Sequence, residues 1–341
     1  MPTKTTRFAI TALFASAAFA QPPAAGPLDR VLHFTHAETD QQLQEIATDI
    51  RGITEMPQVS VDSAQKTLTL HGTAAQITAA EWLLTQWDNS APAQQPENPA
   101  AHQYRLSGDD IVRVFHLSYA RTPRTLQDMA INVRTITDIR RVFTYNAPGV
   151  MTVRGNASQI ALAEWLVSQL DQPAGQAARS AASHEYRPSG AADDVVRIFY
   201  PAHTGTPQGL AELATDVRSI ADLAKVLMVH LQSTAIIVRG TAAKIALAEW
   251  LVNELDQPAN QPPRTPSPHE YRLSGAVEDV VRVFFLTHAE SPQRLQQIAS
   301  EVRSTTEVKR IFIYNAPRAI AARGTAAQIA WADRLITERD R

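Results

Sequence analysis

Histidines and paired carboxylates are the side chains of this 341-residue chain that could hold a metal or transfer a proton. A transition-metal site needs three or four ligands within about 2–2.5 Å of the ion. The sequence has ten histidines but neither a His-x-x-x-His nor a Glu-x-x-His spacing. Six of them recur in two sets far apart in the chain, His36, His203 and His288 in one set and His102, His184 and His269 in the other. Tyr119, a poor substitute for a histidine ligand, takes the place of the first set's missing member. We therefore interpret these histidines as strand-end or linker residues, and we expect no metal site.

The carboxylate pairs Asp109-Asp110 and Asp193-Asp194 each precede an apolar run, in a turn that contains glycine. General acid–base catalysis by two carboxylates needs environments that separate their pKa values, which a solvated turn does not supply. The sequence also has no Gly-x-Ser-x-Gly elbow, no phosphate-binding glycine loop and no zinc-protease motif. We interpret both pairs as turn residues, and the sequence predicts no catalytic residues, no enzyme activity and no cofactor.

Tryptophan is the better candidate for function, because it recurs beside a glutamate in three alanine-rich segments. The candidate interaction residues are Trp82, Trp165 and Trp250. At about 100° per residue, position 165 lies about 500° round from Ile160, off the apolar face of that helix. Such a side chain could bind a partner or a neighbouring copy, or its ring could cover the edge of its own sheet, and both interpretations stay open. In the last copy Arg334 replaces the tryptophan and Trp331 precedes it, as expected of a terminal copy without a further neighbour.

These residues recur because the chain repeats one sequence pattern four times. The copies open at Arg30, Arg113, Arg197 and Arg282, so successive copies start 83 to 85 residues apart. Three copies close on Glu-Trp-Leu, and the last closes on Asp333-Arg334-Leu335. Repetition at this period indicates four small modules in place of one large domain.

The fourth copy shows the expected element order. Residues 280–287 are β-branched and aromatic and predict a strand, after which Ser291-Pro292 begins an amphipathic helix. Strands are expected over 310–314 and 319–323, and a final helix begins at the capping box Thr325 to Gln328. In copies two to four a Tyr-Arg segment precedes this set of elements, where it could pair as an edge strand.

The fold class predicted is therefore α+β, with four tandem two-layer modules of strand-helix-strand-strand-helix. Helices would cover one face of each sheet, and the other face would be solvated. The expected modules are 28–89, 102–171, 184–256 and 269–341. Between them lie Pro/Ala/Gln-rich linkers at 90–101, 172–183 and 257–268, and their composition favours independent modules on a string over a stacked solenoid.

The first twenty residues predict export. Lys4 and Arg7 precede an uncharged apolar stretch at 8–19, and Ala18-Phe19-Ala20 offers a small-x-small cleavage site, so 1–20 is expected to be a secretory signal peptide. The apolar stretch is short for a membrane span; an uncleaved anchor is the alternative. We expect no span in the mature chain.

Composition narrows the class of protein further. There is no cysteine, which excludes disulfides and thiolate chemistry and suits a bacterial cell envelope better than a small disulfide-rich secreted domain. The net charge is −2, so no basic footprint indicates nucleic acid or a membrane surface.

The repeated motifs resemble those of a known family. Val281 to Pro292, Ile237 to Ile245 and Trp250 to Asp256 are similar to the periplasmic N-terminal modules of bacterial secretins, which are KH-like in fold. Like those modules, two copies close on Leu-Asp, at Leu170-Asp171 and Leu255-Asp256. The resemblance implies stacking into periplasmic rings and contacts with protein partners. No pore domain is seen in the sequence, so it implies no channel.

Taken together, the sequence predicts an exported, non-enzymatic repeat protein of the bacterial cell envelope, periplasmic or envelope-associated. Its modules would mediate protein–protein interaction or assembly, with envelope proteins or with a second copy, through helix flanks and free sheet edges. The alternatives are an accessory or truncated component of a secretin-type secretion system, and an extracellular adhesin or ligand-binding repeat protein.

Overall fold

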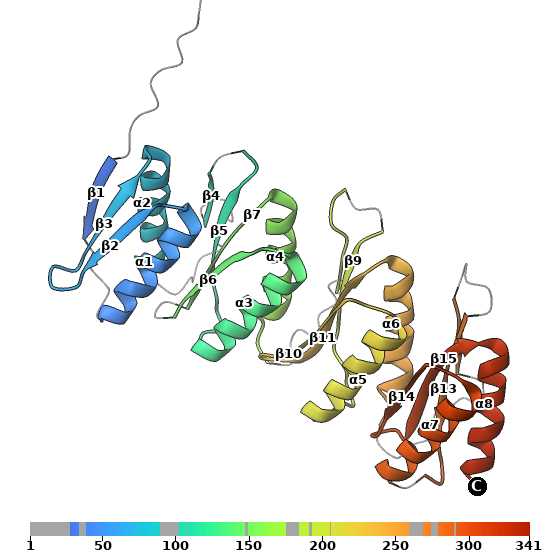
Figure 1. Cartoon of the computed structure of the whole chain (residues 1–341). Helices are drawn as coiled ribbons and strands as arrows, with labels where there is room; N and C mark the ends of the chain where they lie inside the picture. Colours follow the sequence, from blue (N-terminus) through green and yellow to red (C-terminus); the bar gives the residue numbers. More distant parts are fainter. Residues whose placement is uncertain are drawn as a thin grey trace, which may run out of the picture.

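The computed structural model describes residues 28–33, 39–88, 102–106, 108–146, 149–174, 184–190, 193–204, 206–258, 269–273, 279–289 and 291–341. Four modules of similar design follow one another in a row (Figure 1). The predicted signal peptide 1–20, His36 and most of the three predicted linkers lie outside the described residues, so those predictions stay untested.

Each module has the predicted order of strand, helix, strand, strand and helix, and modules 2 to 4 carry one more short strand in front. Module 1 consists of β1 (Leu28–His33), α1 (Asp40–Thr54), β2 (Gln58–Asp62), β3 (Thr67–Gly72) and α2 (Ala74–Asp88). Module 2 consists of β4 (Gln103–Arg105), β5 (Ile111–His116), α3 (Pro123–Thr137), β6 (Arg141–Tyr145), β7 (Val150–Gly155) and α4 (Ala157–Leu170). Module 3 consists of β8 (Glu185–Tyr186), β9 (Val195–Phe199), α5 (Pro207–Ile220), β10 (Lys225–His230), β11 (Thr234–Gly240) and α6 (Ala242–Leu255). Module 4 consists of β12 (Glu270–Arg272), β13 (Asp279–Phe285), α7 (Pro292–Thr306), β14 (Arg310–Tyr314), β15 (Ala319–Thr325) and α8 (Ala326–Arg339).

The sheets are antiparallel and share one topology. The strand order is β1-β3-β2 in module 1 and β4-β5-β7-β6, β8-β9-β11-β10 and β12-β13-β15-β14 in the others. The α+β class is confirmed, and so is the edge strand expected of the Tyr-Arg segments, since β4, β8 and β12 each pair with the next strand.

Side-chain caps fix where the helices begin. Thr325 accepts from the backbone N–H of Gln328 while the Gln328 amide accepts from that of Thr325, which is the predicted capping box. Asn156 and Gln159 repeat this arrangement at the start of α4. At the other end of the first helix of each module an arginine donates to a carbonyl of the following strand, as Arg134 does to Val142 at 2.7 Å. These bonds hold helix and sheet of one module in register.

The prediction that one face of each sheet is solvated is wrong for modules 2 to 4. Val112 and Val114 of β5 belong to the same apolar cluster as Ile46, Ile50 and other residues of module 1. The next cluster joins module 2 to Val196 and Ile198 of β9, and the third joins module 3 to Val281 and Val283 of β13. Each of these sheets is therefore covered on one face by its own helices and on the other by the preceding module.

The expectation of independent modules on a string is wrong for the same reason. The described modules share apolar clusters across all three junctions, so burial of one module's core needs its neighbour. Polar linker composition misled, because a polar connection along the surface is compatible with tight packing of the elements that it connects. The architecture is a stack, in the manner of repeat proteins.

None of the helices in the described ranges has the length and hydropathy required to cross a membrane.

Candidate functional site: the joint between modules

The strongest recurrent feature is the contact between successive modules, which we call the joint. In each joint the first helix of one module (α1, α3 or α5) packs on the outer sheet face of the next. At joint 1 the helix approaches the sheet closely, since a Cβ on Gly52 of α1 would clash with the ring of Phe143 on β6. At joint 3, Tyr314 of β14 is 1% exposed and shares a hydrogen bond of 2.8 Å with the hydroxyl of Thr204 in module 3.

An arginine of the following module caps the helix of the preceding one in every joint. Arg154 donates to the carbonyl of Ile53 at 2.7 Å, Arg239 to that of Ile136 at 2.5 Å, and Arg323 to that of Ile220 at 2.6 Å. The last carbonyls of a helix lack partners inside the helix and carry the negative end of its dipole, so a guanidinium there satisfies both needs. The same bond in three places shows that the stacking has one geometry.

A carboxylate of its own module holds each of these arginines. Arg154 is paired with Asp110 at 2.5 Å, Arg239 with Asp194 at 2.6 Å, and Arg323 with Asp279 at 2.6 Å. Asp110 and Asp194 are members of the acidic pairs that the sequence analysis interpreted as turn residues. They lie in turns, but they also position the arginine that binds the neighbour, and this role was missed.

A second ionic contact follows the helix end, where a left-handed residue closes each first helix. Glu55 is paired with Arg141, Asp138 with Lys225, and Asp222 with Arg310, each across a joint. The φ angles of 56°, 61° and 56° at these three acidic residues place them in the left-handed region, which turns the chain away from the helix. These pairs are more exposed than the capping arginines, so they contribute less to stability.

The recurring tryptophans lie at the side of the joint. Each packs against a tyrosine of the next module, with ring centroids 5.3 Å apart for Trp82 and Tyr104, 5.4 Å for Trp165 and Tyr186, and 5.5 Å for Trp250 and Tyr271. Each ring also packs against the apolar cluster that contains its own module's core. The role of the three tryptophans as interaction residues for a partner stays a prediction.

Histidines complete the side contact. His102 lies 2.5 Å from the amide oxygen of Gln86, His184 lies 3.1 Å from that of Gln169, and His269 lies 2.6 Å from a carboxylate oxygen of Glu254. The histidine comes from the incoming module and its partner from the last helix of the preceding one. These histidines were expected to be strand-end or linker residues, and the structure adds that they contact the neighbour.

The other histidine set lies within modules. His203 and His288 each contact the backbone carbonyl of the residue that follows their own module's final helix, Asp256 and Asp340. The Asp340 carboxylate also accepts from the backbone of Thr287, His288 and Ala289. Across the described ranges no group of three metal-ligating side chains comes together.

The two ends of the stack differ from the joints. Val31 on β1 occupies the position of Val114 on β5, since Val31 faces Thr69 and Val114 faces Thr152 across equivalent strand pairs. Val31 is 53% exposed and Val114 is 1% exposed. The rest of module 1's outer face is polar, with Gln58, Ser60 and His71 where module 2 has Arg141, Phe143 and Arg154. Within the strands that the structure describes, module 1 thus presents no apolar sheet face for a further module.

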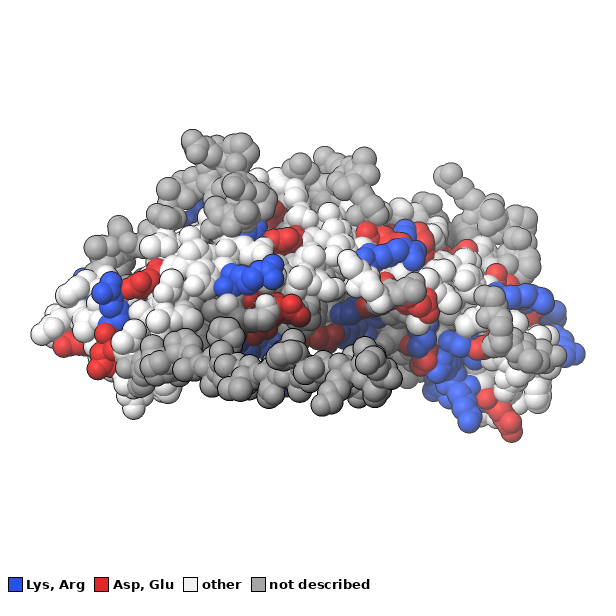
Figure 2. Space-filling model, turned by 90° about the horizontal axis from the view of Figure 1, so that it is seen from above, with Lys and Arg blue, Asp and Glu red and all other residues white. Residues whose placement is uncertain are grey.

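The first helix of module 4 likewise lacks the surface on which a following sheet would pack, because its outward residues are polar and bonded to α8. Arg294 and Glu301 stand where α5 has Gly209 and Asp216. Glu301 is paired with Arg339 of α8 at 2.5 Å, and Arg294 donates to the carbonyl of Arg339 at 2.9 Å. A polar outer face on the terminal copy is typical of capped repeat arrays. On the side of the molecule shown in Figure 2, acidic and basic side chains are interspersed, so no large field of one sign marks that side.

Buried acids in the joints carry shifted pKa values. Burial, with a smaller effect of Glu45, raises the pKa of Asp49 on α1 to about 8. Burial and Glu212 raise the pKa of the equivalent Asp216 on α5 well above its ordinary value. Across joint 3, burial raises the pKa of the Tyr314 phenol to about 12, and the nearby Asp216 makes a small contribution in the same direction. Module 2 carries Asn132 at this position, which needs no proton.

We expect Asp49→Asn to stabilise the protein increasingly as the pH rises. The unfolded Asp49 ionises near 3.8, whereas the folded one keeps its proton up to about 8, so the free energy of unfolding falls with rising pH across that interval. Asparagine removes this loss, and the gain over the parent should reach the order of a few kcal/mol above pH 8. Denaturant titrations at pH 5, 7 and 9 measure it. The reverse change, Asn132→Asp, should destabilise with the same trend, and a gain independent of pH would contradict the assignment.

Trp165→Ala is expected to cost about 2 kcal/mol of stability, because the indole packs on the core cluster of module 2 and on Tyr186 of module 3. Trp331→Ala is the matched control, since Trp331 is 47% exposed and should change stability by less than about 0.5 kcal/mol. Equal effects of the two substitutions in chemical denaturation would contradict the role of Trp165 in the joint.

Comparisons with known proteins give structural matches only. No family model and no curated protein sequence matches the chain. ExeD of Aeromonas hydrophila matches at 16% identity over 69% of this chain and 42% of its own, with a TM-score of 0.17. The N-terminal domain of the secretin XcpQ from Pseudomonas aeruginosa matches at 16% identity over 43% of this chain and 62% of its own, with a TM-score of 0.18. A structure of XcpQN012 matches at 17% identity over 68% of this chain and all of its own, with a TM-score of 0.23.

The matched structures include N-terminal domains of secretins, the family that the sequence motifs resemble. The chain spans less than two thirds of the length of ExeD and of the XcpQ N-terminal domain. TM-scores this low describe no shared overall arrangement, so the case for function depends on the joints and the open surfaces described above.

Proposed function

We propose that this chain is an exported, non-enzymatic scaffold of the bacterial cell envelope, which holds protein partners at fixed spacing along a stiff row of four modules. The observation that carries the proposal is the joint, repeated three times with the same arginine bond to a helix end, the same Trp–Tyr contact and a shared apolar cluster. Fixed joints serve a protein that positions others, and they are unnecessary in a set of independently tethered binding domains.

The closed ends favour a finite scaffold over an open filament. A chain that stacked head to tail with further copies would need an apolar sheet face on module 1 and an open first helix on module 4. Module 1 presents a polar sheet face, and module 4 ties its helix to Arg339. The partners would therefore bind along the sides.

Strand addition at the edge of module 1 is one such side contact. In modules 2 to 4 a short strand, β4, β8 or β12, covers the edge of β5, β9 or β13, whereas β1 is itself an edge among the described strands. Leu28 and Val31 on it are 48% and 53% exposed. An unpaired edge offers backbone N–H and C=O groups to an incoming strand.

Export and envelope location rest on the signal-like pattern of residues 1–20 and on the absence of cysteine. Cell fractionation of the native protein tests both. Recovery of a chain shortened by about twenty residues from the periplasm or envelope is the expected result. A full-length chain in the cytoplasm would overturn the proposal.

The scaffold itself is tested by limited proteolysis and small-angle scattering of the purified chain. We expect scattering from an extended particle of fixed shape, and cleavage confined to the connections between modules without release of stable single modules. Four freely tumbling bodies, or four separately stable fragments, would overturn it.

The two alternatives make different predictions. An accessory or truncated component of a secretin-type secretion system would co-purify with a secretion complex from envelope fractions. An adhesin or ligand-binding repeat protein would bind surfaces or glycans through isolated modules, but the shared apolar clusters leave an isolated module with an exposed apolar face. The structure therefore favours a function that needs the whole row.

A further inference from the structure

The last helix of each module presents one face to the segment that enters the next module. On α6 this face carries Leu247, Trp250 and Glu254, and it receives Tyr271 of β12 and His269, which directly precedes that strand. On α4 the corresponding Leu162, Trp165 and Gln169 receive His184 and Tyr186. The incoming segment has the same form in all three joints: a histidine directly before a short strand and a tyrosine within that strand.

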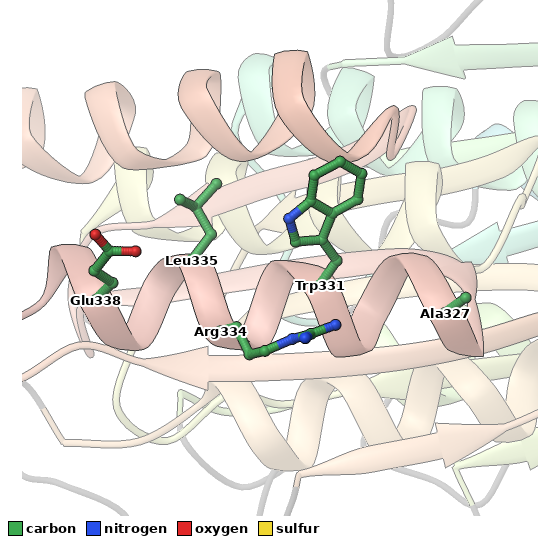
Figure 3. A pocket seen from close by; sticks show the side chains of 5 residues that line it. All are labelled: Ala327, Trp331, Arg334, Leu335 and Glu338. Carbon is green, nitrogen blue, oxygen red and sulfur yellow. The ribbon is translucent and has the colours of Figure 1, made fainter.

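The same face of α8 is open. Its residues Ala327, Trp331, Arg334, Leu335 and Glu338 line a hollow of about 420 Å³. Counted from the N-cap, Trp331 corresponds to Leu247, Arg334 to Trp250 and Glu338 to Glu254. Leu247 is 1% exposed, and Trp331 is 47% exposed. Figure 3 shows all five side chains on α8, with Trp331 and Leu335 projecting to the same side.

A complete further module does not fit this end. Stacking needs the first helix of the preceding module, and on α7 that helix carries Arg294 and Glu301 tied to α8 through Arg339. The side face of α8 has no such closure among the described residues. At module 4 the face of the last helix is thus exposed, whereas the first helix is tied to α8 and does not offer a stacking surface.

We propose that the hollow on α8 is a docking site for an extended segment of another protein, which carries an aromatic residue two positions after a histidine or another basic residue. Glu338 would pair with the basic group, as Glu254 does with His269. The aromatic ring would pack against Trp331 and under the Arg334 guanidinium, which stacks on aromatic faces and replaces the tryptophan of the other joints. The three described His-x-Tyr segments are already held in joints, and Arg294 and Glu301 tie α7 to Arg339 where a further module would stack, so the occupant is assigned to another protein. The inference deepens the proposed scaffold function, on which it rests for its biological setting.

The test uses the full purified chain and a synthetic peptide of residues 267–275, which contains the chain's own His-Glu-Tyr-Arg segment. Titration is followed by the indole N–H signal of Trp331 in NMR spectra and by calorimetry. We expect saturable binding that is weakened at least about tenfold by Trp331→Ala or Glu338→Ala. A peptide with alanine in place of its tyrosine should bind equally weakly.

Thr337→Ala is the matched control, because Thr337 is exposed on the same helix outside the hollow. It should bind the peptide as the parent does. No binding at millimolar peptide, or equal binding by the parent and Trp331→Ala, would overturn the proposal. Self-association of the free chain that Trp331→Ala abolishes would assign the hollow to a second copy and overturn the occupant named above. None of these outcomes affects the proteolysis and fractionation tests. The docking proposal can therefore be wrong while the scaffold proposal stands, and the experiments distinguish the two cases.

Discussion

Val114→Asp is expected to destabilise the protein by about 4 kcal/mol and to separate module 2 from module 1. Val114 is 1% exposed in the cluster shared by the two modules, and a carboxylate there would lose its hydration without gaining a partner. In a chain of independent modules the same residue would face solvent, and the substitution would be nearly neutral. Denaturant unfolding measures the loss, and proteolysis between modules 1 and 2 reports the separation.

Val31→Asp is the matched control, since Val31 takes the same strand position in module 1 and is 53% exposed. Its cost should stay below about 1 kcal/mol. Similar effects of the two aspartates would show that the sheet faces of modules 1 and 2 are equally solvated, and the stacked arrangement would be wrong. The comparison isolates the joint, because both substitutions make the same chemical change in the same kind of strand.

The sequence predicted the elements of each module because their signals are local. Ser291-Pro292 marks the start of α7, and Thr325 with Gln328 marks the start of α8, through bonds within one turn of helix. The strand and helix order follows from such punctuation and from periodicity, and four copies of the pattern supported one another. The Tyr-Arg segments were expected as edge strands for the same reason.

The stacking was not predicted, although the strands carried a signal for it. Residues 235–238 read Ala-Ile-Ile-Val without a polar break, and residues 280–286 interrupt an apolar run only at Arg282. A sheet with one solvated face shows alternation, whereas near-continuous apolar strands are typical of sheets buried on both faces. In module 1, Asp29 takes the strand position that Val112 holds in module 2, which fits its open face. The difference between the strands of module 1 and those of the later copies, more than any one strand, indicated which sheets are covered on both faces.

The roles of single residues in the joint depend on distance in space, which spacing along the chain does not give. Trp165 was recognised as lying off its helix's apolar face, but only the fold brings Tyr186 to it. Asp110 was interpreted as a turn residue, and its partner Arg154 lies 44 residues away on β7. Contacts of this kind join elements that no local sequence pattern brings together.

Arg154→Ala is expected to cost about 3 kcal/mol, because it removes the partner of a buried helix-end carbonyl and of a partly buried carboxylate. The Arg154 side chain is 8% exposed and bonds the Ile53 carbonyl and the Asp110 carboxylate, so alanine leaves the helix end unsatisfied inside joint 1 and takes the cation from Asp110. Arg154→Lys should recover only part of the loss, since an ammonium cannot reproduce the forked contact.

Arg187→Ala serves as the control, because Arg187 is paired with Glu185 but is 59% exposed. Its removal should cost less than about 1 kcal/mol in the same denaturant titration. A loss for Arg154→Ala no larger than that of the control would mean that the arginine bond only accompanies the stacking, and that the apolar cluster alone holds the modules together.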